Sequence, residues 1–328
     1  VKRRDVVGLA CWMPVLSGRT HLRELRMLNR NPEDATDGVF ESGGHAMSDS
    51  VRDLLQRMDA RRLRDLDVPR WLVLERDGVN GHSSLPRSAA EIRAAAQGLD
   101  LPAPQPAIGA SLGRRTRDTW GYFRHMVWGI ARYPFYRSHR PGSIVWEGLG
   151  WVRAQAMQHR DAARAQATLE ALKGQRYFLF PLQLTSDFQI RVHSPFASMR
   201  QAADYVLASF AAHAPKDVKL VVKEHPLDFA SFGRWRAYVA RRARQMGLGD
   251  RLVHLAGGDL DALALGSLGM VVVNSTSATF ALAGGVPVKA LGTAVYAIEG
   301  ITDQGRLADF WTSPTPPDRA LWDDFCRV

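Results

Sequence analysis

The chain has 328 residues, 46% of them hydrophobic, and a formal net charge of +10 at pH 7. This length predicts two domains of ordinary size. The basic residues are spread through expected helices such as 234–244, without aromatic-interleaved RNA motifs or zinc-finger spacing, which argues against nucleic acid and leaves an anionic membrane face or acidic substrates as partners.

Targeting and redox signals are sparse. No apolar run approaches the roughly 18 residues of a membrane span, and no signal peptide is visible. Cys11 and Cys326 form no metal or redox pattern, which fits a reducing cytosol. The chain begins at Val1 rather than Met, so a preceding segment is left open.

The first 81 residues predict alternating strands and helices. We expect a short buried strand over 5–12, amphipathic helices over 20–28 and 51–63, and a strand over 71–74. Charged and glycine residues follow that last strand, in the segment Glu75–Gly81. Open α/β sheets use such strand ends for ligand contact, although Glu75 is equally compatible with a solvated turn.

The middle of the chain predicts mainly helices. A helix over 88–98 precedes a segment, 116–136, that is rich in aromatic and basic residues and would contact a membrane surface, an acceptor glycan or the neighbouring domain's core. We expect a short strand ending at Trp146–Gly148 and a long helix over 151–173. The predicted domains are therefore residues 1–174 and 175–328.

The second half predicts a doubly wound parallel sheet. Apolar strands are expected over 177–183, 218–222, 251–255 and 269–273, the last of them rich in β-branched residues. They alternate with helices expected over 198–212, 234–246, 259–265 and 278–283. Regular alternation of this kind is typical of a Rossmann-like α/β domain, whose polar strand ends meet at one edge of the sheet.

The strongest candidate site follows the strand over 269–273. Asn274, Ser275, Thr276 and Ser277 separate this strand from a short helix. Hydroxyls and backbone N–H groups at the start of a helix favour an anion, so the turn is a candidate phosphate site. Ordinary N-capping by Ser or Thr is the alternative interpretation.

Two other strand ends carry candidate residues. Lys223 and His225 follow the strand over 218–222 and would hold two anionic groups, such as a phosphate and a carboxylate. A packed histidine is the alternative for His225. Asp187 lies in the polar loop 184–194 and would act as a nucleophile or base, or as a turn former.

Other chemistries lack their motifs. Asp65-Leu66-Asp67 and Asp259-Leu260-Asp261 match the D-x-D pattern of metal-dependent sugar-nucleotide enzymes, but capping and solvation explain both. Serine-hydrolase elbows, zinc-protease helices, Walker loops and glycine-rich dinucleotide fingerprints are not found. We therefore expect neither a metal nor a redox cofactor.

Four ordered motifs resemble the capsule polysaccharide biosynthesis and export proteins, the β-Kdo transferases of Gram-negative capsules. The similarity covers about residues 71–324. Its motifs are Leu74–Gly81 with Ser83–Arg87, Pro181–Gln183 through Asp187, Lys223–Pro226, and Asn274–Ser277. Residues 1–70 lack the glycine-rich opening strand of that family, so the first domain is expected to be truncated or divergent.

The resemblance implies a GT-B-type glycosyltransferase with two Rossmann-like domains facing a cleft, an acceptor-side domain and a nucleotide-sugar domain. CMP-Kdo is then the donor, without a metal. A phosphatidylglycerol-type lipid is the acceptor, at the cytoplasmic face of the inner membrane beside a capsule export complex. A GT-B enzyme with another nucleotide sugar, a sugar-nucleotide epimerase and a non-catalytic export partner remain alternatives.

The same resemblance assigns roles to individual residues. Asp187 becomes the nucleophile of a retaining reaction, and Glu75 the acid/base or acceptor contact. The expected nucleotide-binding residues are Gln183, Lys223, His225, Asn274, Ser275, Thr276 and Ser277.

Overall fold

The computed structural model describes residues 80–83, 85–99, 120–121, 124, 128, 144–184, 187–226, 228 and 234–328. The elements expected between residues 5 and 74, and Glu75 itself, lie outside this part of the chain. Two compact units are formed by residues 1–84 with 107–139 and by residues 85–106 with 140–328. The domain boundary at residue 174 stays a prediction.

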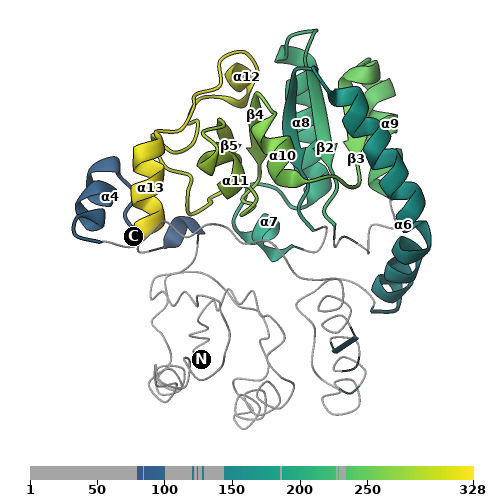
Figure 1. Cartoon of the computed structure of the whole chain (residues 1–328), viewed down its shortest axis with the longest axis horizontal. Coiled ribbons are helices and arrows are strands. Elements are labelled where there is room, and N and C mark those ends of the chain that lie inside the picture. The colour runs from purple at the N-terminus through teal and green to yellow at the C-terminus, as the bar shows by residue number, and fades with distance from the viewer. Residues whose placement is uncertain are drawn as a thin grey trace, which may run out of the picture. The chain divides into compact units, whose positions relative to one another are not determined.

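The second unit is built on a five-stranded sheet (Figure 1). Its strands are β1 (Tyr177–Pro181), β2 (Lys219–Lys223), β3 (Leu252–Leu255), β4 (Gly269–Val272) and β5 (Val288–Ala290). Their order is β3-β2-β1-β4-β5, and every neighbouring pair is parallel. The predicted parallel α/β sheet is therefore confirmed, with β5 as an additional strand that the sequence reading missed.

Helices cover both faces of this sheet (Figure 1). Those of the second unit are α4 (Ala89–Ala96), α6 (Ile144–Leu172), α7 (Phe188–Val192), α8 (Met199–His213), α9 (Arg234–Gln245), α10 (Leu260–Leu265), α11 (Ala278–Ala283), α12 (Leu307–Phe310) and α13 (Arg319–Arg327). Short 3-10 turns lie at Asn80–His82 and Gly249–Arg251. No helix in the described ranges is long and apolar enough to cross a membrane.

The strands alternate between two buried cores. On β1, Phe178 and Phe180 pack with α8, α9 and α12, whereas Leu179 packs with α10, α11 and α13 on the opposite face. Because successive side chains of a strand point to opposite faces, continuously apolar strands fill both layers. This three-layer arrangement leaves the carboxyl ends of the strands as the edge at which loops and polar side chains gather.

Side-chain caps fix where several of these helices begin. Ser198 accepts a hydrogen bond from the amide of Gln201 at the start of α8, and Asp318 accepts one from Leu321 at the start of α13. Asp259 caps α10 in the same way. The capping interpretation of Asp259 in its D-x-D match is thus confirmed.

One predicted strand is wrong. Trp146–Gly148 lies inside α6, which runs without a break from Ile144 to Leu172. The local run of β-branched and aromatic residues suggested a strand, but tertiary packing overrides that weak preference. In the structure Ala165 and Leu172 of α6 are buried in the core on one face of the sheet.

Candidate functional site

The site lies where the strand order reverses. β1 is flanked by β2 on one side and by β4 on the other, and the chain winds outward in both directions from this pair. Open α/β sheets bind ligands outside the carboxyl ends of the strands at such a switch point. Gln183 follows β1 and Asn274 follows β4, so the two loops that border this point both carry predicted site residues.

Gln183 and Asn274 tie these loops together. The Gln183 Nε2 atom donates to Asn274 Oδ1 at 3.0 Å, and the Asn274 amide donates back to Gln183 Oε1 at 3.1 Å. Asn274 Nδ2 donates to the carbonyls of Gln189 and His193, at 2.9 and 3.3 Å. The side-chain NH₂ groups of Gln183 and Asn274 are used in these bonds. Both buried side chains therefore hold the loops after β1 and β4 in place. Their predicted direct contact with a nucleotide stays a prediction.

Asp187 is held by two hydrogen bonds. Its Oδ1 atom accepts from the Gln189 amide at 2.9 Å and thereby caps α7, while Oδ2 accepts from Gln183 Nε2 at 3.1 Å. The carboxylate is half-buried. A carboxylate has about four acceptor positions, so two lone-pair directions remain for chemistry. Asp187 is thus both a helix cap and an oriented carboxylate, and its catalytic role stays a prediction.

Lys223 places a buried cation at the end of β2. Only 6% of the residue is exposed, and within the described residues its ammonium group forms no hydrogen bond or ion pair. Burial lowers the pKa of Lys223, and the carboxylates of Asp259 and Glu224 oppose that shift. A desolvated cation without a direct counter-ion attracts an anionic ligand strongly.

Glu224, which lies between Lys223 and His225 in the sequence, pairs with a residue of β3. Its Oε2 atom lies 3.1 Å from His254 Nε2 on β3, and both side chains are 12% exposed. The Glu224 amide also donates to the Leu255 carbonyl at 2.8 Å. Glu224 therefore anchors the end of β2 to β3, and leaves Lys223 and His225 as the cationic candidates of this motif.

His225 is electrostatically coupled to the rest of the edge. Burial lowers the pKa of its imidazole, the carboxylates of Asp228 and Asp187 act in the opposite direction, and the charge of Lys223 lowers it further. An imidazole with a depressed pKa is neutral near pH 7 and can donate from one ring nitrogen and accept at the other. β1 and β2 are neighbouring parallel strands with Pro181 opposite Lys223, so Asp187 and His225 follow strand ends that lie side by side.

The hydroxyl turn after β4 has open backbone donors. Ser275 Oγ accepts from the amide of Ser277 at 3.2 Å and lies 2.8 Å from its hydroxyl, and Tyr296 donates to the Ser275 carbonyl at 2.5 Å. Ser277, the residue before α11, makes no side-chain cap. Within the part of the chain that the structure describes, the amides of Ser275 and Thr276 meet no acceptor.

Sequence reasoning missed parts of the site that lie later in the chain. Gly292, just after β5, passes so close to the α7 loop that an added Cβ would lie 2.7 Å from the His193 carbonyl oxygen. Thr293 donates to that same carbonyl through its amide, at 2.9 Å, and its hydroxyl, at 3.0 Å. The glycine just after the largely apolar segment 286–291, which contains Lys289, was the available signal for this close approach.

Asp228 was also missed. It is buried, accepts from Trp235 Nε1 at 3.0 Å, and its amide donates to the His225 carbonyl at 3.1 Å. Asp228 therefore fixes the turn that carries His225. Among the described residues no group of three or more His, Cys, Asp or Glu side chains is arranged to hold a metal ion.

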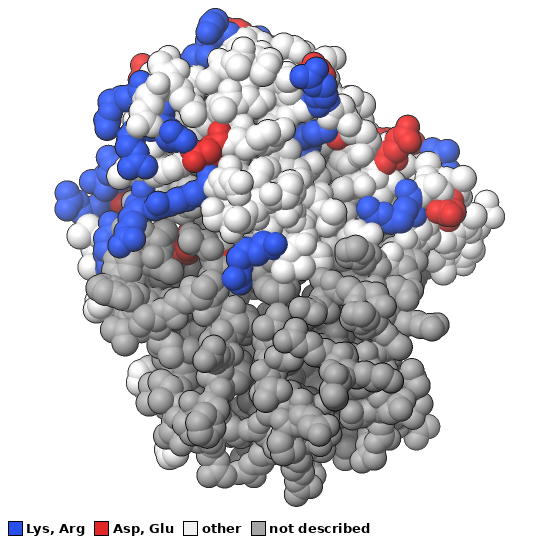
Figure 2. Space-filling view, turned by 180° about the vertical axis from the view of Figure 1, so that it is seen from behind, with Lys and Arg blue, Asp and Glu red and all other residues white. Residues whose placement is uncertain are grey.

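A separate basic surface lies on α9. This helix carries Arg234, Arg236, Arg241, Arg242 and Arg244 and no acidic residue. In Figure 2, Lys and Arg side chains gather on the left, the side on which α9 lies in that view. An arginine-rich helix surface of this kind favours anionic partners.

Two tryptophans of the aromatic segment are on the surface. Trp120 is 71% exposed and Trp128 is 68% exposed, and both lie in helical conformation with exposed Arg124 between them. Whether segment 116–136 contacts a surface partner or packs on the neighbouring domain stays a prediction.

Comparisons with known proteins find proteins of capsule polysaccharide synthesis, modification or export. A family model described as capsule polysaccharide biosynthesis protein matches residues 51–328. The capsule polysaccharide modification protein LipB of Neisseria meningitidis serogroup A is 34% identical over 261 residues, which are 77% of this chain and 62% of the relative. The capsule polysaccharide export protein KpsS of Escherichia coli is 33% identical over 78% of this chain and 66% of its own length.

The solved structures include the β-Kdo 2,7 transferase KpsC of Thermosulfurimonas dismutans, with 20% identity and a TM-score of 0.33, over 56% of this chain and 57% of that chain. The chain spans less than two thirds of the length of LipB and KpsS.

Proposed function

Because the chain belongs to the capsule polysaccharide biosynthesis family, we propose that it is a glycosyltransferase that moves Kdo from CMP-Kdo to a lipid-linked acceptor. One observation carries the proposal. Buried Lys223, neutral His225, oriented Asp187 and the hydroxyl turn at Ser275 all border one switch-point edge. Two cationic or neutral donors beside a carboxylate suit an anionic sugar donor.

The donor carries two anionic groups that these residues match. Kdo has a carboxylate next to its anomeric carbon, and CMP supplies the phosphate. We assign the carboxylate to the ammonium group of Lys223 and the phosphate to His225 and the amides of Ser275 and Thr276. As CMP departs, charge grows on the phosphate, so these donors stabilise the transition state more than the ground state.

In the proposed reaction an Asp187 oxygen attacks the anomeric carbon while the bond to the CMP phosphate breaks and CMP leaves. An acceptor hydroxyl then attacks the same carbon, loses its proton to a base and releases Asp187 as a carboxylate. Two inversions give net retention. Glu75 is our candidate acid/base, and it lies outside the described residues.

The acceptor side of the proposal is a phosphatidylglycerol-type lipid at the cytoplasmic face of the inner membrane, within a capsule export machinery. The exposed tryptophans 120 and 128 support a peripheral membrane contact, since Trp side chains favour the membrane–water interface. The arginines of α9 support attraction to anionic headgroups. We further propose that residues 1–174 form the acceptor-side half of a GT-B arrangement that needs no metal or other cofactor.

The test is incubation of the full chain with CMP-Kdo and a synthetic Kdo-lipid, followed by mass spectrometry of the lipid and measurement of released CMP. We expect a product heavier by one or more Kdo units. UDP-sugars serve as competing donors, because a GT-B enzyme with another donor specificity would use one of them. Transfer from a UDP-sugar but not from CMP-Kdo would overturn the donor assignment.

A second candidate is a non-catalytic partner of the export machinery that binds glycolipid. One observation favours it: both oxygens of Asp187 already accept hydrogen bonds, one of them as the cap of α7. A capping aspartate needs no catalytic role. Binding of CMP-Kdo without CMP release in the presence of acceptor would favour this candidate over the transferase.

A further inference from the structure

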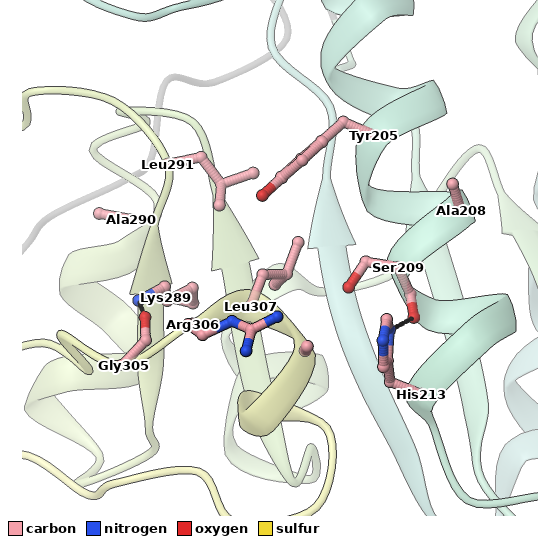
Figure 3. A pocket seen from close by; sticks show the side chains of 11 residues that line it. Tyr205, Ala208, Ser209, His213, Lys289, Ala290, Leu291, Gly305, Arg306 and Leu307 are labelled. Carbon is pink, nitrogen blue, oxygen red and sulfur yellow. Dashed lines mark hydrogen bonds between the residues drawn. The ribbon is translucent and has the colours of Figure 1, made fainter.

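One cavity is lined by residues outside the strand-edge site, which we define as Gln183, Asp187, Lys223, His225 and Asn274–Ser277. It is a groove of about 580 Å³ between α8, β5 and the start of α12 (Figure 3). The lining residues with polar or aromatic side chains are Tyr205, Ser209, His213, Lys289 and Arg306. None of them belongs to the strand-edge cluster, and none is acidic. The groove has the size of an ordinary small-molecule site and positive lining charge.

Lys289, on β5, lines this groove. Its ammonium group donates to the carbonyl of Asp303 at 3.0 Å and to the carbonyl of Gly305, and it lies 3.5 Å from Asp303 Oδ1. The residue is 8% exposed. Because its donors are used within the fold, Lys289 is a structural group that fixes the segment 303–305 and so positions Arg306.

Arg306 is the cation that a ligand would meet. Its side chain is exposed, extends into the space between β5 and α8 in Figure 3, and forms no hydrogen bond or ion pair within the described ranges. Guanidinium groups bind carboxylates with two parallel hydrogen bonds. Arg306 is therefore available to pair with a carboxylate that enters the groove.

Groups on α8 complete the opposite wall. His213 Nδ1 lies 3.0 Å from the Ser209 carbonyl, which places the proton on Nδ1 and leaves Nε2 for a ligand. Ser209 Oγ accepts from Trp311 Nε1 at 2.9 Å, so its own proton remains available. Tyr205 is 51% exposed, and its ring packs on Phe196 with centroids 5.6 Å apart.

We propose that this groove binds an acidic sugar unit, a hydroxylated ring that carries one carboxylate. The carboxylate pairs with Arg306, the ring hydroxyls meet Ser209 and His213, and the apolar face of the ring packs on Tyr205. This inference deepens the proposed function and rests on it, since a Kdo-bearing acceptor or product chain supplies such units. It adds a glycan subsite on the α8 face, separate from the donor site.

The experiment measures binding of free Kdo to the full chain by saturation-transfer NMR titration. It uses a Lys223→Met/His225→Ala background, in which the strand edge contributes little. We expect Arg306→Gln to weaken Kdo binding about tenfold or more, since a charge-assisted bidentate pair is lost, and Tyr205→Ala to weaken it as well. Arg244→Gln, an exposed arginine of α9, is the matched control and leaves binding unchanged.

Two results would overturn the inference. One is Kdo affinity that is absent or insensitive to Arg306→Gln and Tyr205→Ala in variants that still melt cooperatively. The other is glucose, CMP or inorganic phosphate binding with the same dependence on Arg306, which would assign the groove to another ligand class.

The outcome is separable from that of the proposed function, because no turnover is measured. Arg306-dependent Kdo binding without any transfer would leave the subsite standing and remove the transferase. Transfer together with Kdo binding that does not depend on Arg306 would remove the subsite and leave the transferase standing.

Discussion

At the scale of single residues, Asp187 combines two roles that substitution can separate. Asparagine is as good an N-cap as aspartate but a far poorer nucleophile. We predict that Asp187→Asn keeps the cap of α7 but loses the bond from Gln183, because an asparagine Nδ2 group cannot accept. The melting temperature should therefore fall by only about 2–4 °C, whereas transfer should fall on the order of 10⁴-fold. Transfer is measured as CMP release with acceptor, and stability by thermal unfolding.

The control for this change is Asp318→Asn. Asp318 caps α13 and pairs with Arg93 on the surface, so the same chemical change is made at a cap distant from the strand-edge cluster. It should leave transfer intact. Near-normal transfer by Asp187→Asn would remove Asp187 from the mechanism and leave it as a cap alone.

Lys223 and Lys289 are buried lysines for which we predict stability changes of opposite sign. Lys223 is 6% exposed without a direct partner among the described residues, whereas Lys289 is 8% exposed and bound to Asp303 and Gly305. Replacing an unpaired buried cation by an apolar group relieves desolvation, while breaking a satisfied pair leaves a buried carboxylate. Lys223→Met should keep or raise the free energy of unfolding, and Lys289→Met should lower it by about 3 kcal/mol.

Urea denaturation measures both changes, and titration with CMP-Kdo measures donor affinity. We expect Lys223→Met to weaken donor binding about tenfold or more, because a charged contact is lost. A Lys223→Met protein that is markedly less stable than the parent would show that this ammonium group stabilises the fold and is not kept for ligand binding.

At the scale of elements, the bond between the loops after β1 and β4 is the feature most open to test. Gln183 and Asn274 exchange two hydrogen bonds across 91 residues of sequence. In a double-mutant cycle with Gln183→Ala and Asn274→Ala, we expect each single change to cost about 1–3 kcal/mol. The double change should cost less than the sum, by about 1 kcal/mol or more.

The matched comparison is the exposed pair Lys173–Glu170, whose atoms are also in contact, at 2.8 Å. Surface pairs couple by about 0–1 kcal/mol, so its cycle should be nearly additive. Additive costs for Gln183 and Asn274 would mean that the two loops are held independently of one another.

The elements also show where sequence reasoning succeeds and fails. Short apolar runs with polar ends predicted β1 to β4, because their length and their polar flanks fit strands that are buried on both faces. β5 was missed since it has only three residues, one of them Lys289. α7 was missed because a five-residue helix capped by Asp187 has the composition of a polar loop.

For the site residues, too, the sequence predicted some features and missed others. The strand-end rule predicted where Lys223, His225 and Ser275 lie, since it depends only on local strand boundaries and a parallel sheet. It could not predict partners. Glu224 pairs with His254, 30 residues away, and the side-chain NH₂ group of Gln183 donates to Asp187 and Asn274. Such choices are fixed by tertiary packing, which no local pattern encodes.

At the scale of the whole molecule, His225 links the site to the pH dependence of stability. Burial lowers the pKa of His225 in the folded protein below 6.5, so the unfolded chain binds the proton more readily. The stability that this group contributes is therefore present above about pH 6.5 and is lost as the pH falls towards the folded-state pKa. We expect the free energy of unfolding to decrease over that range.

The pH dependence is measured by urea denaturation between pH 5 and 8 on the parent and on His225→Gln. The difference between the two proteins isolates this histidine from the other titrating groups. A difference that does not change with pH, or that grows in favour of the parent as the pH falls, would show that the imidazole is not desolvated in the folded state.

We propose that CMP-Kdo binds at the carboxyl edge of the sheet and not at another surface. Hydrogen–deuterium exchange of the full chain with and without saturating CMP-Kdo tests it most directly. We predict slower exchange in peptides that cover 182–194, 223–228 and 274–278, and loss of that protection in Lys223→Met. Unchanged exchange in all three segments, with protection elsewhere in the chain, would contradict the account.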